Sequence, residues 1–178
     1  MVTRFFFAVS LIIICSYSYS QFDDMSRAEY IFDIVKYVKW ENEEVIDTFK
    51  IVVLDTSTQL YLKLKEEAAE KKSIHSKPVK VLLLDEISQI TDVSVIYMNR
   101  MRGYDINEIL SIIRGRNILL ITENYEYQKS MINFIEIQGK KKFEINERRM
   151  NQEGMTVSPL FMALGVNQKL TGRNCIYR

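Results

Sequence analysis

Apolar and polar positions alternate with two different periods along the chain, and the change of period predicts strands followed by helices. Near-continuous apolar runs between polar residues predict strands buried on both faces at 49–54, 79–84, 93–98 and 118–122. Apolar residues at helical spacing predict helices at 25–40, 58–72 and 104–114. Strands that alternate with helices form βαβ units, so the pattern predicts a largely parallel sheet covered on both faces.

A period of two marks the last third of the chain. Apolar and polar residues alternate over 131–138, Gly139 supplies a turn, and 140–145 returns as a second strand. The return strand begins with three lysines, at 140–142, which suit an exposed sheet edge that must not pair with other chains. An antiparallel C-terminal hairpin is therefore predicted.

A short helix is predicted to close the domain. Ser158 and Pro159 are typical N-cap and first-turn residues, an apolar run follows them, and Gly165 is expected to end the helix. The segment between hairpin and helix is predicted to be a polar turn. The fold class expected from all these elements is a three-layer α/β sandwich, with a mostly parallel sheet and an antiparallel C-terminal hairpin.

The first twenty residues have the pattern of a cleavable signal peptide. Arg4 gives a positive start, 5–15 is apolar, and small residues at 18–20 predict cleavage before Gln21. Ile14 precedes Cys15, which argues against a lipoprotein, and the run is shorter than the roughly 20 apolar residues of a membrane anchor. The prediction is an exported protein with one domain over residues 21–178.

The charge balance excludes several classes of partner. The chain has 24 basic and 23 acidic residues, and removal of 1–20 takes one arginine, so the mature net charge is 24 − 1 − 23 = 0. A neutral chain without a basic cluster argues against nucleic-acid binding. One cysteine, Cys175, remains after cleavage, so an intramolecular disulfide is excluded and Cys175 is either free or joins two chains.

No enzyme signature is present in the sequence. There is no G-x-S-x-G turn and no Gly-rich phosphate loop, and the single histidine, His75, is expected to be a solvated loop residue. One histidine and one cysteine do not make a zinc site. The sequence therefore predicts no catalytic residue, no metal and no cofactor. The segment 122–124 ends a predicted strand, where ligands often bind in open α/β sheets.

Three residues allow both a structural and a binding interpretation. Trp40 packs in the core or lines a pocket mouth or partner contact. Glu144 and Asn146 alternate at a strand end and point the same way, so they can bind a polar partner. In the structural alternative, Glu144 pairs with Arg148 or Arg149, and Asn146 caps a following helix.

Several motifs together resemble the YfiR/HmsC family. They are the Ile-rich strand with its Gly turn, the run Phe143-Glu144-Ile145-Asn146, the run 154–158 (GMTVS), and the Leu/Ala helix after it. Upstream, 30–40 is similar to the family's opening helix with its aromatic end, and 49–54 to its first strand. The resemblance covers about residues 28–165. The chain departs from the family at Glu41, where a proline usually follows the tryptophan, and it lacks the disulfide of some relatives.

The resemblance implies a regulatory function. Proteins of this family are periplasmic, form homodimers, and hold off an inner-membrane diguanylate cyclase by binding its sensory domain, which lowers cyclic-di-GMP and restrains biofilm formation. Partner or ligand contacts would then fall on Trp40, Phe143, Glu144 and Asn146. Three alternatives stay open: a ligand-sensing module acting on a sensor histidine kinase, an envelope structural or assembly factor, and a hydrolase that would depend on His75 or on a serine.

Overall fold

The computed structural model describes residues 24–54, 58–99, 106–138 and 140–165. The predicted signal peptide, the turn residue Gly139 and Cys175 lie outside these ranges, as does the predicted helix start at 104–105. None of the helices in the described ranges has the length and apolar character needed to cross a membrane.

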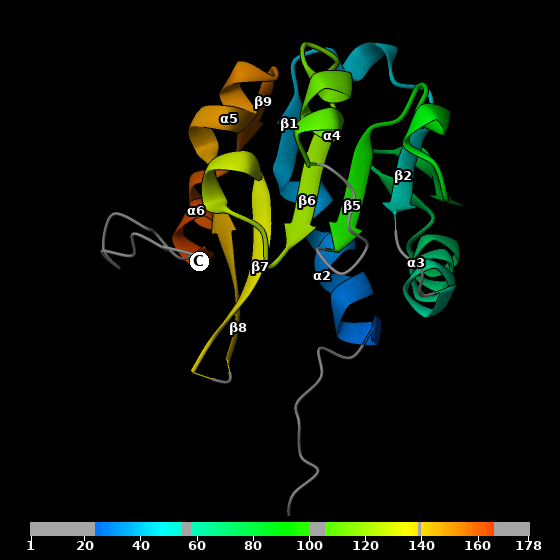
Figure 1. The fold of residues 1–178 in the computed structure, drawn as a ribbon. Helices are drawn as coiled ribbons and strands as arrows, with labels where there is room; N and C mark the ends of the chain where they lie inside the picture. The colour runs from blue at the N-terminus through cyan, green and yellow to red at the C-terminus, as the bar shows by residue number, and fades with distance from the viewer. Residues whose placement is uncertain (1–23, 55–57, 100–105, 139, 166–178) are drawn as a thin grey trace, which may run out of the picture.

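A seven-stranded sheet forms the centre of the domain, with the strand order β3-β4-β2-β5-β6-β7-β8 (Figure 1). Its five inner strands are parallel: β2 (Phe49–Leu54), β4 (Lys77–Leu83), β5 (Val95–Asn99), β6 (Leu119–Glu123) and β7 (Ile132–Ile137). The edge strands β3 (Ser73–Ile74) and β8 (Lys140–Ile145) pair antiparallel with their neighbours. The predicted strands and the C-terminal hairpin are thus confirmed.

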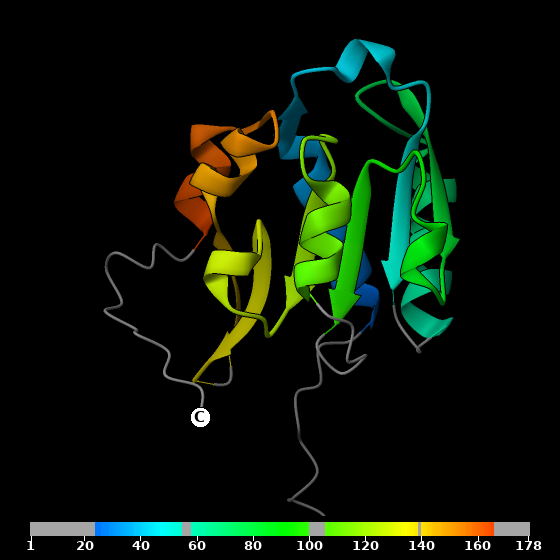
Figure 2. The same ribbon diagram turned by 45° about the horizontal axis from the view of Figure 1, so that its top comes forward.

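Helices cover both faces of this sheet, which confirms the predicted three layers. α2 (Asp24–Tyr37) and α3 (Thr58–Lys71) pack together behind it, and α4 (Ile106–Ile113) lies in front (Figures 1 and 2). The residues of β2, β5 and β6 are almost all buried, as expected for strands covered on both faces. On α3, Leu60 and Leu64 are buried whereas Leu62 is half exposed.

A salt-bridge cluster joins the two rear helices. The Lys71 Nζ of α3 lies 2.6 Å from Glu67 Oε2 and 3.4 Å from Asp33 Oδ1 of α2. Burial lowers the pKa of Lys71, but pairing with these two carboxylates outweighs burial and raises the pKa above its ordinary value of 10.5.

The end of the first helix differs from the prediction. The helix stops at Tyr37, and the next residues form β1 (Val38–Trp40), which pairs antiparallel with β9 (Met155–Val157). Val38 and Trp40 are buried while Lys39 between them is exposed, so the segment has the period of a strand. The predicted helix through Trp40 was wrong because pairing with a distant strand prevailed over local helical spacing.

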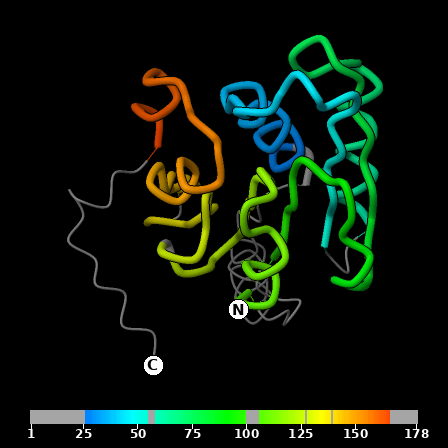
Figure 3. Tube along the Cα trace, turned by 90° about the horizontal axis from the view of Figure 1, so that it is seen from above, coloured from blue at the N-terminus to red at the C-terminus, as the bar shows by residue number. Residues whose placement is uncertain are grey.

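The segment after the hairpin is more structured than the predicted polar turn. It contains α5 (Glu147–Gln152) and β9, followed by α6 (Pro159–Leu164). The predicted N-cap of α6 is confirmed, since Ser158 Oγ accepts a hydrogen bond from the Phe161 amide. α6 ends at Gly165, where a Cβ atom would come within 3.0 Å of the Ile145 side chain. Figure 3 shows these C-terminal elements at the opposite end of the molecule from β2, α3 and β4.

Candidate functional site

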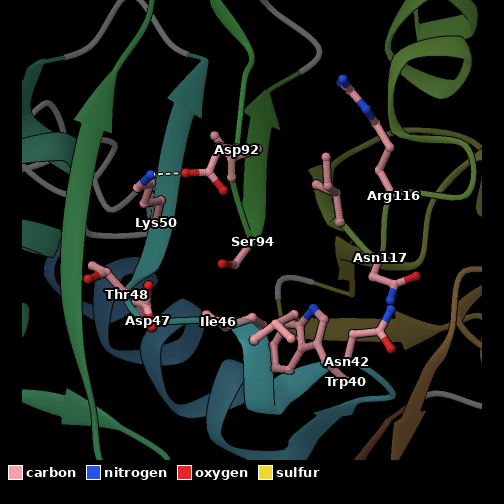
Figure 4. Close-up of a pocket in the computed structure, with 13 residues that line it drawn as sticks. Trp40, Asn42, Ile46, Asp47, Thr48, Lys50, Asp92, Ser94, Arg116 and Asn117 are labelled. Atoms are coloured by element: carbon pink, nitrogen blue, oxygen red, sulfur yellow. Dashed lines mark hydrogen bonds and ion pairs between the residues drawn. The ribbon is translucent and has the colours of Figure 1, made fainter.

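A pocket lies at the amino edge of the parallel sheet. The chain segments that lead into β2, β5 and β6 meet there, because parallel strands begin at the same edge. The cavity has a volume of about 470 Å³ and is closed on one side by Trp40 and the loop after it. Its lining residues are Trp40, Asn42, Val45, Ile46, Asp47, Thr48, Lys50, Asp92, Val93, Ser94, Arg116, Asn117 and Ile118 (Figure 4).

Trp40 is held at this pocket by strand pairing and by ring contacts. Opposite Met155 in the β1–β9 pair, it is 4% exposed. Its indole ring meets the Phe49 ring edge-on, with ring centroids 5.1 Å apart, and the His75 ring at 6.3 Å. The indole nitrogen Nε1 is buried and has no hydrogen-bond partner within the described ranges. Trp40 is therefore a core residue and a pocket residue at once.

His75 and Lys77 fix the loop that forms one pocket wall. Lys77 Nζ donates hydrogen bonds to the Glu43 carbonyl (2.6 Å) and the Ile46 carbonyl (2.5 Å). His75 Nε2 lies 2.8 Å from the Lys36 carbonyl oxygen, and Nδ1 lies 2.8 Å from Glu43 Oε1. The expectation of a solvated loop histidine was wrong, because its side chain is 22% exposed and connects α2, β3 and the loop after β1.

A glycine allows the C-terminal segment to approach the pocket rim. Gly154 has a φ of +68°, and a Cβ atom there would lie 3.0 Å from both Asn117 Oδ1 and Glu41 Oε2. The Glu41 amide donates a hydrogen bond to the Gly154 carbonyl at 2.8 Å. A side chain at position 154 would therefore be strained and would push against the pocket rim.

The charged groups of the pocket differ in their pairing. Lys50 forms an ion pair with Asp92 on one side of the pocket. On the other side, the exposed Arg116 has no ion pair or side-chain hydrogen bond with a described residue. Asp47 is also exposed and lies beside Thr48, across the pocket from Arg116 (Figure 4). Such a site can bind a small polar molecule with one charged end.

The predicted site residue Glu144 belongs to a buried hydrogen-bond network with Asn133, its partner in the strand ladder. Asn133 Nδ2 donates to Glu144 Oε2 at 3.0 Å and to the Tyr125 carbonyl at 2.8 Å. Asn133 Oδ1 accepts from the Tyr125 amide at 3.1 Å and from Thr122 Oγ1 at 2.9 Å. Glu144 is 7% exposed, so it fixes the sheet edge and does not face solvent as a binding carboxylate would.

The structural alternative for Asn146 is confirmed. Asn146 is the N-cap of α5, and its Oδ1 accepts a hydrogen bond from the Arg149 amide at 3.1 Å. The Arg149 side chain donates from Nε to the Gln128 carbonyl. Asn146 itself is 9% exposed.

Phe143 belongs to a stack of three aromatic rings. Phe161 lies between Phe143 and Tyr37, with ring centroids 5.1 and 5.2 Å apart and nearly parallel ring planes. The stack connects β8, α6 and the end of α2. Of the four predicted site residues, Trp40 alone lines the pocket, and the structure does not bring the four together.

At the carboxyl edge of the sheet, Glu123 is engaged by the fold. Tyr97 Oη and Asn99 Nδ2 donate to Glu123 Oε2 at 2.6 and 3.3 Å, and Arg27 of α2 pairs with Oε1 at 3.3 Å. The sequence indicated a ligand site at this carboxyl edge, at segment 122–124, whereas the described pocket lies at the amino edge. Within the described ranges, no group of three or more His, Cys, Asp or Glu side chains is placed to hold a metal ion.

Sequence reasoning did not find the pocket residues Asp92, Ser94 and Arg116. They lie in short connections just before strands, where their polar character matches that of any surface loop. The usable signal was their position, since residues that precede neighbouring parallel strands must meet at one edge.

The fold and the pocket define a small three-layer α/β domain with a polar recess at the amino edge of its sheet. A family model described as YfiR/HmsC-like matches residues 24–166, which include all the described elements. The chain therefore belongs to the YfiR/HmsC-like family, and the resemblance seen in the sequence is confirmed. A comparison with proteins of curated function gave no match.

Proposed function

We propose that the protein is a periplasmic regulator that represses an inner-membrane diguanylate cyclase by direct contact, and so restrains cyclic-di-GMP production and biofilm formation. The observation that carries this proposal is the family match over residues 24–166. Repression by contact requires that the protein bind the inactive form of the receptor better than the active form. The predicted signal peptide would deliver the protein to the compartment where the sensory domain lies.

An exposed apolar surface on the C-terminal helix supports contact with another protein. Leu160 and Leu164 of α6 are 69% and 65% exposed, and as residues four apart they lie on one face of the helix. Tyr37, 41% exposed, stacks on Phe161 of the same helix. Adjacent exposed apolar side chains of this kind are typical of protein contact sites.

The test is a crosslinking pull-down of the tagged protein from envelope extracts, followed by mass spectrometry. We expect recovery of a membrane protein with a periplasmic sensory domain and a diguanylate cyclase domain. The double variant Leu160→Glu/Leu164→Glu should lose it, because two carboxylates would have to be desolvated in the contact. Leu62→Glu is the matched control, since Leu62 is a 50% exposed leucine on α3.

Other outcomes would contradict the proposal or would place the contact on another surface. Recovery of only an envelope protein without a cyclase or kinase domain would favour an assembly factor. Equal recovery by the α6 variant and the wild type would place the contact elsewhere. A hydrolase would instead show an activity that is lost on His75→Ala.

The pocket supports a second candidate function, a ligand-sensing module that acts on a sensor histidine kinase. The specific observation is the recess beside Trp40, where the buried indole nitrogen has no hydrogen-bond partner among the described residues. This candidate predicts that a ligand raises the thermal unfolding temperature of the isolated protein. It also predicts that a sensor kinase, in place of a cyclase, is recovered in the pull-down.

A further inference from the structure

One buried polar atom in the Trp40 pocket, the indole nitrogen Nε1 of Trp40, has no hydrogen-bond partner among the described residues. The hydroxyl of Ser94 and the exposed guanidinium of Arg116 line the same recess. A buried polar atom normally finds a partner in the fold, so the unpartnered Nε1 beside these two polar groups points to a ligand.

The indole nitrogen specifies one feature of that ligand. An indole N–H is a donor only, so the missing partner is a hydrogen-bond acceptor. Figure 4 shows Nε1 on the side of the ring that faces the pocket. Because Nε1 itself is buried, a small shift of the neighbouring rim would have to accompany the approach of an acceptor.

The charges of the pocket specify a second feature. Lys50 is neutralised by Asp92, which leaves Arg116 as the unpaired cation among the described lining residues. A guanidinium presents a planar fork of donors that matches a carboxylate. With the carboxylates of Asp47 and Asp92 also in the lining, a monoanion suits the site better than a doubly charged phosphate.

We propose that this pocket binds a small organic carboxylate. The carboxylate group pairs with Arg116, an acceptor oxygen takes the Trp40 N–H, and the apolar part of the ligand lies against Trp40, Val93 and Ile118. A volume of about 470 Å³ is within the usual size of small-molecule sites. The inference deepens the ligand-sensing candidate and rests on that function for its biological role.

Trp40 is the chain's single tryptophan, so its fluorescence reports on this pocket alone. The probes are benzoate and benzamide, which have nearly the same size and shape but differ in charge. We expect benzoate to change the Trp40 fluorescence saturably and to bind at least about tenfold more tightly than benzamide, since a charged pair with Arg116 is worth about a factor of ten.

Arginine variants separate the proposed contact from a general charge effect. Arg116→Gln should weaken benzoate binding about tenfold. Arg114→Gln is the matched control, since Arg114 is an exposed arginine two positions away that does not line the pocket, and it should leave binding unchanged.

Several results would overturn the proposal. They are the absence of a saturable response to benzoate, equal binding of benzoate and benzamide, and equal loss in the two arginine variants. Tighter binding of inorganic phosphate than of benzoate would show an anion site of another class. These measurements use the isolated protein, so their failure is distinct from failure of the receptor pull-down.

Discussion

Asn133 shows how a single buried side chain can determine the sheet edge. Its amide makes hydrogen bonds with Glu144, Tyr125 and Thr122, so donors and acceptors are matched inside the protein. We predict that Asn133→Asp lowers the free energy of unfolding by about 2–4 kcal/mol, since it removes two donated hydrogen bonds and buries a second carboxylate beside Glu144. Urea unfolding followed by circular dichroism measures the change.

A second substitution tests the cause of that loss. In the Asn133→Asp background, Glu144→Gln supplies an amide donor and removes one of the two charges, so about 1 kcal/mol or more should return. If Glu144→Gln lowers stability equally in both backgrounds, the two side chains are not coupled, and the network does not account for the burial of Glu144.

For single residues, the sequence indicated a role only where that role depends on residues nearby in the chain. The capping alternative for Asn146 is confirmed, and it was available from the sequence because capping depends on the residues that immediately follow. The role of His75 could not be predicted, because its neighbours Lys36, Glu43 and Trp40 come from segments that are distant in sequence. Glu144 was ambiguous for the same reason, since its partner lies on the opposite strand of the hairpin.

The short helix α5 depends on its cap. It has six residues, too few to be stable by hydrogen bonding alone, and its N-terminus is closed by Asn146. We predict that Asn146→Ala lowers the free energy of unfolding by about 1 kcal/mol, and that Asn146→Ser restores most of it because serine also caps. Urea denaturation of the three proteins measures this difference. Equal stability of the alanine and serine variants would contradict a capping role.

Element prediction succeeded where the signal was long and local. The apolar runs at 49–54 and 118–122 and the hairpin at 131–145 appear as expected, because burial on both faces or strict alternation specifies them locally. β1 and β9 have three residues each, and their pairing joins positions more than a hundred residues apart. No local pattern of that length distinguishes a strand from the end of a helix.

In the whole molecule, the pocket and the aromatic stack both form because the fold brings together segments that are distant in sequence. The order of the strands was needed to place Lys50, Ser94 and Arg116 at one edge, and a list of predicted elements does not give that order. The connections that lead into the strands at this edge are polar, unlike the apolar strands themselves. Their charged side chains therefore line the recess. The candidate pocket is therefore built from the segments that the hydrophobic pattern predicts least.

The aromatic stack joins the C-terminal elements to the main sheet. Phe161 is 3% exposed and lies between Tyr37 and Phe143, and the Ser158 amide donates to the Tyr37 carbonyl beside it. Phe161→Ala should lower the free energy of unfolding by about 3–5 kcal/mol, because it leaves a cavity and removes both ring contacts. Tyr37→Phe keeps the ring and should change stability by less than about 0.5 kcal/mol.

Hydrogen exchange distinguishes local release of this segment from general destabilisation. If the stack is what fastens α6, Phe161→Ala should speed amide exchange in α6, β1 and β9 well before it affects β5 and β6, whose residues are buried on both faces. A uniform increase through all strands would mean that the C-terminal elements and the sheet open as one unit. The selective pattern would instead show that α6 and the β1–β9 pair, which carries Trp40, can open without the central sheet.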